Sequence, residues 1–167
     1  MRMPAITMEW LKANDACSEA RAAHRQKSYT NNAVCILTDL VELETENLYS
    51  ALDDRTRLQW ANWLVARILP HHEQVRYAIF AARQVLALYS TKCPDDDRPL
   101  KAIEAAEAYL DGTGAADAAA YAAYAAADAA AGTGAAYAAA YAAEYSATLR
   151  RIIENGILLT KGQLRPV

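Results

Sequence analysis

Residues 111–151 read DGTGAADAAAYAAYAAADAAAGTGAAYAAAYAAEYSATLRR, and this stretch decides the fold. Alanine is the best helix former because it has no side-chain entropy to lose on ordering. Glycine commonly follows the last residue of a helix, and threonine is a favoured residue at a helix start. Each GTG triplet, at 112–114 and 132–134, therefore marks a break between helices. We predict two alanine- and tyrosine-rich helices, over 115–131 and 135–155, joined by a tight turn.

The two parts of this stretch repeat one unit. Residues 112–123 read GTGAADAAAYAA, and residues 132–143 read GTGAAYAAAYAA. Two copies are fewer than the three that a solenoid needs for stability. The repeat therefore predicts a duplicated helix-turn unit inside a larger helical protein.

Tyrosine and acidic side chains interrupt the alanines at helical spacing. In the first predicted helix they step by four, three and four residues. In the second, the tyrosines step by four, so each set shares one helix face. Two interpretations stay open: these side chains fill a seam against the rest of the protein, or they form a recognition surface for a partner. The candidate partner-binding residues are Asp117, Tyr121, Tyr124, Asp128, Tyr137, Tyr141, Glu144 and Tyr145.

The chain as a whole has the composition of a helical domain. Its 167 residues suffice for one domain with a sizeable core. Glycine and proline are few, and no alternating strand pattern occurs, so we predict an all-α, single-domain helical bundle or array. We expect a packing half over 1–110, the helical hairpin over 111–155 and a tail over 156–167.

Capping residues divide the packing half into helices. Thr7 is the predicted cap of the first, short helix, and Asp15, Asn32 and Asp53 each precede a predicted helix. Two prolines, Pro70 and Pro99, suit the beginning of a helix. The predicted helices span 4–12, 16–27, 34–43, 55–69, 73–89 and 101–110. The fourth is apolar around most of its circumference, which indicates a central position in the protein.

Charge is distributed unevenly along a chain whose formal net charge is −3. Between Lys101 and Arg150 there is no basic residue. Six acidic residues fall in that interval: Glu104, Glu107, Asp111, Asp117, Asp128 and Glu144. Phosphate binding needs lysine and arginine, so a nucleic-acid groove on these helices is disfavoured. A protein partner with a basic or neutral surface fits better.

Several functional classes lack their sequence signals. The N-terminus has no long apolar core of a secretory signal, and no apolar run is long enough to span a membrane. Three widely spaced cysteines, Cys17, Cys35 and Cys93, are typical of reduced thiols in a cytoplasmic protein. The adjacent His71 and His72 point in different directions on a helix and form no metal-binding pair. We therefore expect a cytoplasmic protein that is not an enzyme and uses neither a metal nor a cofactor.

One segment of the packing half carries a family resemblance. Residues 76–110 read RYAIFAARQVLALYSTKCPDDDRPLKAIEAAEAYL and precede alanine-rich helices. This arrangement resembles the Imm-5-like immunity protein family over about residues 60–145. The matching signature residues are Asp97, Arg98, Pro99, Ala102, Ile103, Glu104 and Ala105. The N-terminal stretch, with Trp10-Leu11 and Ala16-Cys17, is similar to phage-encoded helical proteins.

The resemblance implies an all-helical protein that protects by binding, with no catalytic residue to carry over. The leading hypothesis is a binding protein that neutralises a partner through the tyrosine- and aspartate-rich face. That partner would be a toxin, or a host defence effector if the protein serves a phage. The alternative is a protein that sequesters a small molecule or nucleotide signal in an aromatic pocket with arginines at its wall. Its candidate residues are Trp60, Trp63, Arg76, Arg83 and Arg98. Close-packing alanine surfaces could also support a homodimer.

Overall fold

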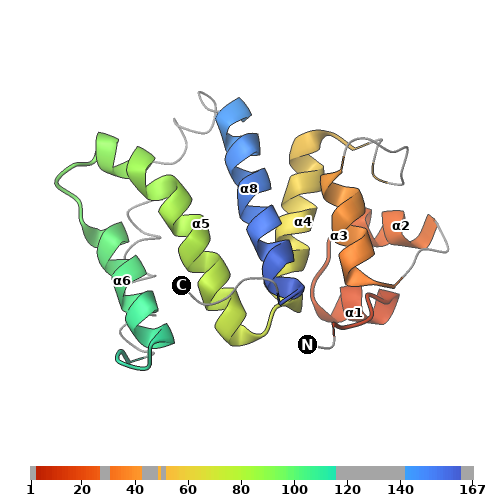
Figure 1. Cartoon of the computed structure of the whole chain (residues 1–167). Helices are drawn as coiled ribbons and strands as arrows, with labels where there is room; N and C mark the ends of the chain where they lie inside the picture. Colours follow the sequence, from red (N-terminus) through yellow and green to blue (C-terminus); the bar gives the residue numbers. More distant parts are fainter. Residues whose placement is uncertain (1–2, 27–30, 43–48, 50–51, 116–141, 163–167) are drawn as a thin grey trace. The chain divides into compact units, whose positions relative to one another are not determined.

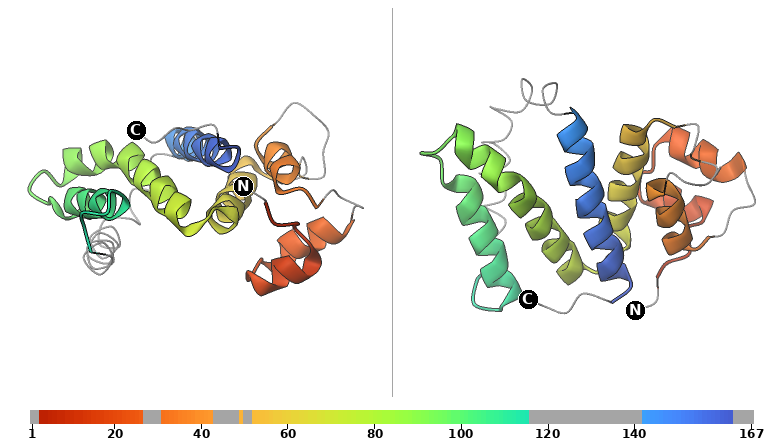
Figure 2. Two further views of the ribbon diagram at one scale, coloured as in Figure 1. Left: turned by 60° about the horizontal axis from the view of Figure 1, so that its bottom comes forward. Right: turned by 45° about the horizontal axis from the view of Figure 1, so that its top comes forward.

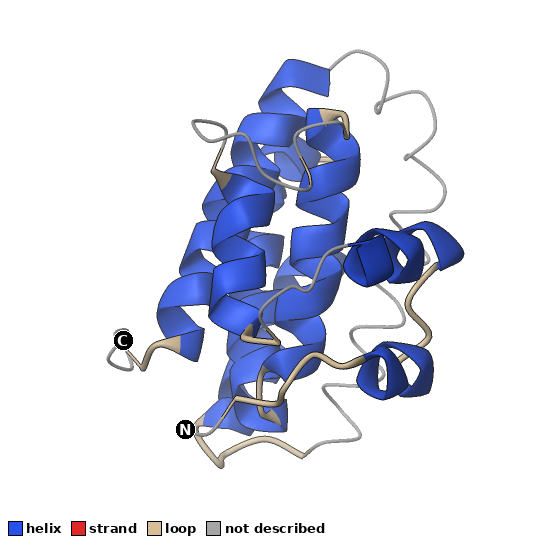
Figure 3. Cartoon of the chain, turned by 90° about the vertical axis from the view of Figure 1, so that its right-hand side faces the viewer, coloured by secondary structure: helices blue, strands red, loops and turns tan. Residues whose placement is uncertain are grey.

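The helices begin and end where local capping chemistry allows. The computed structural model describes residues 3–26, 31–42, 49, 52–115 and 142–162. In chain order its helices are α1 (Met8–Ala13), α2 (Ser18–Gln26), α3 (Ala33–Val41), α4 (Asp54–Ile68), α5 (His71–Lys92), α6 (Arg98–Leu110) and α8 (Ala142–Thr160) (Figures 1 and 3). The all-α prediction is confirmed. Residues 116–131 of the first predicted alanine-rich helix and 135–141 of the second lie outside the described residues, and Ala115 is described as non-helical.

Three predicted caps are present as hydrogen bonds. The Thr7 hydroxyl accepts the backbone N–H of Trp10 at 3.1 Å. The Asn32 side-chain oxygen accepts the N–H of Val34 at 2.9 Å, and Asp53 accepts that of Thr56 at 2.9 Å. Each bond satisfies a donor that the first helical turn cannot pair. Pro99 also lies in the first turn of α6, as its fixed φ predicts.

Asp15 does not cap α2, so that sequence-based prediction was wrong. Asp15 instead ends α1, with a left-handed φ of 57°. Its N–H donates to the Lys12 carbonyl at 3.2 Å, and the next N–H, of Ala16, donates to the Leu11 carbonyl at 2.9 Å. This pair of bonds is the Schellman pattern of helix termination. The α2 cap is Cys17, whose sulfur accepts the Ala20 N–H at 3.4 Å.

The first GTG triplet ends α6 in the same way, and its two glycines have different roles. Gly112 takes the left-handed conformation, with φ of 71°, and Thr113 N–H donates to the Ala108 carbonyl at 2.9 Å. Gly114 lies against the helix end. A Cβ at Gly114 would stand 2.9 Å from the Ala108 Cβ and 3.0 Å from its backbone. One glycine is required by backbone conformation and the other by close approach.

Helix α8 extends past its predicted end at Asn155. It continues through Gly156, which is buried within the helix, to Thr160. The glycine that follows the helix is Gly162, with φ of 64° and its N–H bonded to the Leu159 carbonyl at 3.0 Å. The buried face of α8 consists of Leu149, Ile152, Ile153, Gly156 and Thr160. These residues recur at three- and four-residue steps, so residues 156–160 continue an amphipathic helix.

The described residues group into two compact units. The first unit comprises Met1–Pro70 and Leu149–Val167, and the second comprises His71–Thr148. Helix α8 therefore begins in the second unit and ends in the first. In the second unit α5 and α6 pack side by side, as Figures 1 and 2 show.

The core of the first unit forms where α3 packs on α4. Its most deeply buried side chains include Leu37 of α3, Leu58 and Val65 of α4, and Ile153 of α8. Ile6 joins them from the N-terminal segment, where its N–H donates to the Asn31 carbonyl at 2.8 Å. At about 25 cal/mol for each Å² of apolar surface, burial of such side chains stabilises the unit by roughly 1.5–3 kcal/mol apiece.

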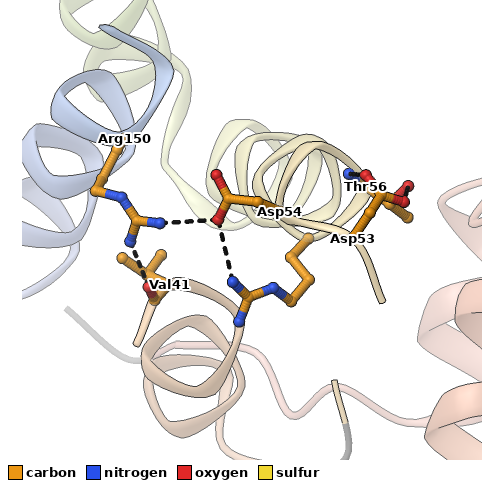
Figure 4. Close-up of polar contacts among 6 residues, drawn as sticks. Val41, Asp53, Asp54, Thr56 and Arg150 are labelled. Carbon is orange, nitrogen blue, oxygen red and sulfur yellow. Dashed lines mark hydrogen bonds and ion pairs between the residues drawn. The ribbon is translucent and has the colours of Figure 1, made fainter. Parts of the chain in front are cut away.

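A guanidinium from α8 joins the ends of α3 and α4 (Figure 4). Arg150 donates one hydrogen bond to the Val41 carbonyl, in the last residue of α3, and another to Asp54 Oδ1 at 2.9 Å. The same Asp54 oxygen accepts a bond from Arg57 at 3.0 Å. Arg57 is only 2% exposed, whereas the Asp54 side chain is 41% exposed. The Asp54 carboxylate thus binds two arginines, the buried Arg57 and the half-buried Arg150.

We expect Gly114→Ala to lower the free energy of unfolding by about 1–3 kcal/mol, because the new methyl group overlaps Ala108 and its backbone. Thr113→Ala is the matched control and removes only an exposed hydroxyl bond to the Ala108 carbonyl. Chemical denaturation followed by circular dichroism measures both. Equal midpoints for Gly114→Ala and wild type would contradict the close approach.

Arg150→Met is expected to lower the free energy of unfolding by about 1–3 kcal/mol. The substitution leaves the Val41 carbonyl without its charged donor and leaves Asp54 with a single arginine. A double-mutant cycle with Asp54→Asn isolates the long-range pair. The coupling free energy should reach at least about 0.5 kcal/mol. Additive effects of the two substitutions would show that the bridge contributes nothing.

Candidate functional site

Most of the predicted partner-binding residues lie outside the described part of the chain. These are Asp117, Tyr121, Tyr124, Asp128, Tyr137 and Tyr141. Glu144 and Tyr145 fall in the first turn of α8, and their side chains also lie outside the description. Their shared helix face stays a prediction.

The described part of the second unit is organised by the hairpin of α5 and α6. Tyr77 of α5 and Ala102 and Ile103 of α6 are buried. An ion pair joins the two helices, because Arg83 donates from Nε and from a terminal nitrogen to one oxygen of Glu107, at 2.8 and 2.6 Å. Both side chains are substantially exposed, so solvent weakens the pair and it stabilises the hairpin only modestly.

Asp96 organises the connection between α5 and α6. One of its oxygens accepts the Tyr89 hydroxyl at 2.7 Å. The carboxylate also binds the Arg98 guanidinium at two points, 2.9 and 2.7 Å, and the Arg98 backbone N–H at 3.1 Å. The Arg98 guanidinium, followed by the Tyr89 hydroxyl, holds the pKa of Asp96 well below its usual range. In turn, the bond to Asp96 raises the pKa of Tyr89 to about 12.

The three candidate phosphate-binding arginines all bind carboxylates. Arg76 pairs with Glu73 at 3.2 Å, one turn away on α5. Arg83 pairs with Glu107, and Arg98 with Asp96. A phosphate would have to compete with these carboxylates for each guanidinium.

The two candidate tryptophans belong to α4 in the first unit. The Trp63 ring meets Trp10 edge-on at a centroid distance of 6.0 Å, and the Arg67 guanidinium lies 4.7 Å from the Trp63 centroid. Trp60 meets Tyr49 edge-on at 6.3 Å. Both tryptophans line one apolar pocket, as walls of a groove. Arg76, Arg83 and Arg98 lie in the second unit, and none of them is among the described residues that line this pocket.

Acidic residues follow one exposed stripe of α6. Asp97, Glu104 and Asp111 are exposed and are spaced seven residues apart, which places them along one side of the helix. Leu100, between the first two, is 39% exposed, and Lys101 pairs with Asp97 at 2.7 Å. We call Asp97, Leu100, Glu104 and Asp111 the α6 stripe. The sequence alone shows the spacing of these residues. Their exposure is known only from the way α6 packs on α5.

The second unit as a whole is acidic. It contains ten acidic and five basic residues, for a net charge of −5, which leaves +2 for the rest of a chain whose total is −3. Four of the five basic residues, Arg76, Arg83, Arg98 and Lys101, already pair with carboxylates. Glu104 and Asp111 have no ion-pair partner among the residues that the structure describes. The outward field of this unit is therefore negative.

Other kinds of site were sought in the same part of the chain. Among the described residues, no three His, Cys, Asp or Glu side chains gather in a way that could hold a metal ion. None of the helices there has the length and hydropathy of a bilayer-crossing segment.

Comparison with known proteins identifies a family. Residues 64–149 match the family described as Imm-5 like putative immunity protein, which is just over half of the chain. The chain belongs to this family. The matched segment of the immunity-protein family coincides with the second unit, residues 71–148, and adds the last residues of α4. It also agrees with the resemblance over about residues 60–145 that the sequence predicts. No curated protein and no solved structure matches the chain.

Asp96→Asn is expected to lower the pKa of Tyr89 from about 12 toward its ordinary value of 10.0, because a neutral amide no longer favours the protonated phenol. The folded pKa lies above the unfolded value. The contribution of Tyr89 to stability is therefore complete below about pH 10 and is lost as the pH rises through about 12.

The Tyr89 titration is measured from tyrosinate ultraviolet absorbance, with Tyr89→Phe subtracted in each background. In the Asp96→Asn variant, the difference curve should show Tyr89 titrating at lower pH than in wild type. An unchanged difference curve would contradict the role of Asp96.

Proposed function

We propose that this protein binds and neutralises a protein toxin and has no catalytic activity of its own. The observation that carries the proposal is the match of residues 64–149 to an immunity-protein family, because that segment coincides with a compact structural unit. A protein that protects by binding needs an exposed, complementary surface and no reacting groups. The family assignment supports this class of function, and the charge and exposure of the second unit support the kind of partner.

Charge favours a partner with a basic surface. The second unit has a net charge of −5, and the exposed Glu104 and Asp111 are free of ion pairs among the described residues. Complementary charge accelerates encounter and disfavours like-charged competitors. A toxin that acts on nucleic acid would carry such a basic surface, because phosphate binding requires lysine and arginine.

We place the contact on the second unit, over the α6 stripe and the tyrosine- and aspartate-rich face of residues 117–145. Tyrosine brings a large contact area at low entropic cost, and it is enriched among residues that dominate binding energy. The exposed Leu100 supplies an apolar contact within an acidic rim. Together these residues would provide the mixed apolar and polar composition of a protein interface.

A second candidate partner is a host defence effector, which the protein would inhibit for the benefit of a phage. The mode of action, neutralisation by binding, would be the same. The identity of the captured partner distinguishes this role from toxin immunity. Sequestration of a nucleotide signal has weaker support, because the three arginines that would take its phosphates each bind a carboxylate.

We expect the tagged chain to capture a protein with a basic surface from cells that carry the toxin. That protein should arrest growth when expressed alone in bacteria, and co-expression of this chain should restore growth. Charge reversal with Glu104→Lys and Asp111→Lys should weaken capture at least tenfold and reduce its salt dependence. The matched control reverses two exposed acids of the first unit, Glu42→Lys and Glu154→Lys.

Three outcomes separate the parts of this proposal. Equal weakening by both charge-reversed variants would exclude the α6 stripe as the contact. A captured protein that still arrests growth in the presence of this chain would exclude neutralisation. Replacement of Tyr121, Tyr124, Tyr141 and Tyr145 by alanine tests the remaining face: a folded variant that no longer captures the partner supports a surface role, and an unfolded one assigns these tyrosines to the core.

A further inference from the structure

The first unit contains a pocket that the family match leaves largely uncovered. It has a volume of about 290 Å³ and lies among α1, α2, α3 and α4, with α8 absent from its described lining. Only Leu64 of its lining falls within the family-matched segment. The lining residues are Ile6, Leu11, Asp15, Ala16, Cys17, Ala20, His24, Ile36, Leu40, Tyr49, Gln59, Trp60, Trp63 and Leu64.

The aromatic walls of this pocket are held in place by neighbouring side chains. Trp63 meets the Trp10 ring edge-on, and the Arg67 guanidinium lies over the Trp63 ring. Arg67 is itself anchored by a hydrogen bond from Nε to the Asn14 carbonyl at 3.1 Å. Trp60 packs edge-on against the buried Tyr49. Such walls need little reordering when a ligand enters, which reduces the entropic cost of binding.

The lining favours an uncharged ligand. Aliphatic and aromatic side chains form most of it, and its described residues include no lysine or arginine. Asp15 would repel an anion, and burial lowers the pKa of His24, which keeps this histidine neutral near pH 7. Burial also raises the pKa of Tyr49 to about 12, so its hydroxyl carries no charge near neutral pH. Cys17, His24 and Gln59 supply a few polar atoms for orientation.

The volume sets the size of the ligand. An engineered apolar cavity of about 150 Å³ in another protein accommodates one benzene ring. The present pocket, at about 290 Å³, has nearly twice that volume. We propose that the first unit binds a small uncharged molecule with two fused aromatic rings between α2 and the tryptophan wall of α4. This site is separate from the proposed partner-binding surface, because every described lining residue belongs to the first unit.

Indole is the probe, and isothermal titration of the full-length protein is the measurement. Ala20→Leu places a larger side chain in the pocket, whereas Ala22→Leu makes the same change on the exposed side of α2. Indole should bind wild type and Ala22→Leu with equal affinity and bind Ala20→Leu at least tenfold more weakly. Indole-3-carboxylate has the same rings with a negative charge, and it should bind wild type at least tenfold more weakly than indole.

The proposal is overturned if wild type takes up no indole near its solubility limit, or if Ala20→Leu binds it as well as Ala22→Leu does. Stronger binding of the carboxylate would overturn the inferred ligand class. Circular dichroism establishes that each variant is folded. If Ala20→Leu does not fold, Gln59→Phe replaces it, because Gln59 lines the pocket from an exposed position on α4. None of these results depends on partner capture by the second unit.

Discussion

The contact of Arg150 with Val41 and Asp54 is the constraint on which the first unit depends. A helix C-terminus presents carbonyls without donors, and a helix N-terminus favours a carboxylate. Val41 ends α3 and Asp54 begins α4. One guanidinium from α8 donates both to the Val41 carbonyl and to the Asp54 carboxylate (Figure 4). The apolar face of α8, with Leu149, Ile152 and Ile153 buried, begins one residue before this arginine. The polar bridge and the buried apolar face of α8 therefore lie next to each other along the helix.

The two units divide the chemistry of the chain between them. The second carries the family match, the negative charge and the exposed acids of α6, which are properties of a surface that meets another protein. The first carries the tryptophans and a partly open apolar pocket, which are the features on which the small-molecule proposal rests. The two proposals therefore concern different units of the chain, and neither proposed role requires the other.

Local signals in the sequence predict much of the helical framework but not its long-range contacts. Thr7, Asn32 and Asp53 begin helices as predicted, because an N-cap depends on side chains within three residues. The predictions at Asp15 and Gly156 were wrong because each residue type suits two kinds of local structure. Aspartate can cap a helix or take the left-handed conformation that ends one. Glycine can end a helix or lie inside one that packing stabilises. The ion pair of Arg150 with Asp54 spans 96 residues, and only the folded chain brings them together. The family signature, by contrast, was readable as a contiguous run.

The discontinuity of the first unit has a consequence during synthesis. Domains fold as units while the ribosome delivers the chain from its N-terminus. The second unit, His71–Thr148, is complete before residue 149 is added, whereas the first unit must wait for α8 to contribute Ile152 and Ile153. Until then the apolar faces of α3 and α4 lack part of their cover. The core of the first unit therefore forms only after the buried residues of α8 have followed the whole second unit out of the ribosome.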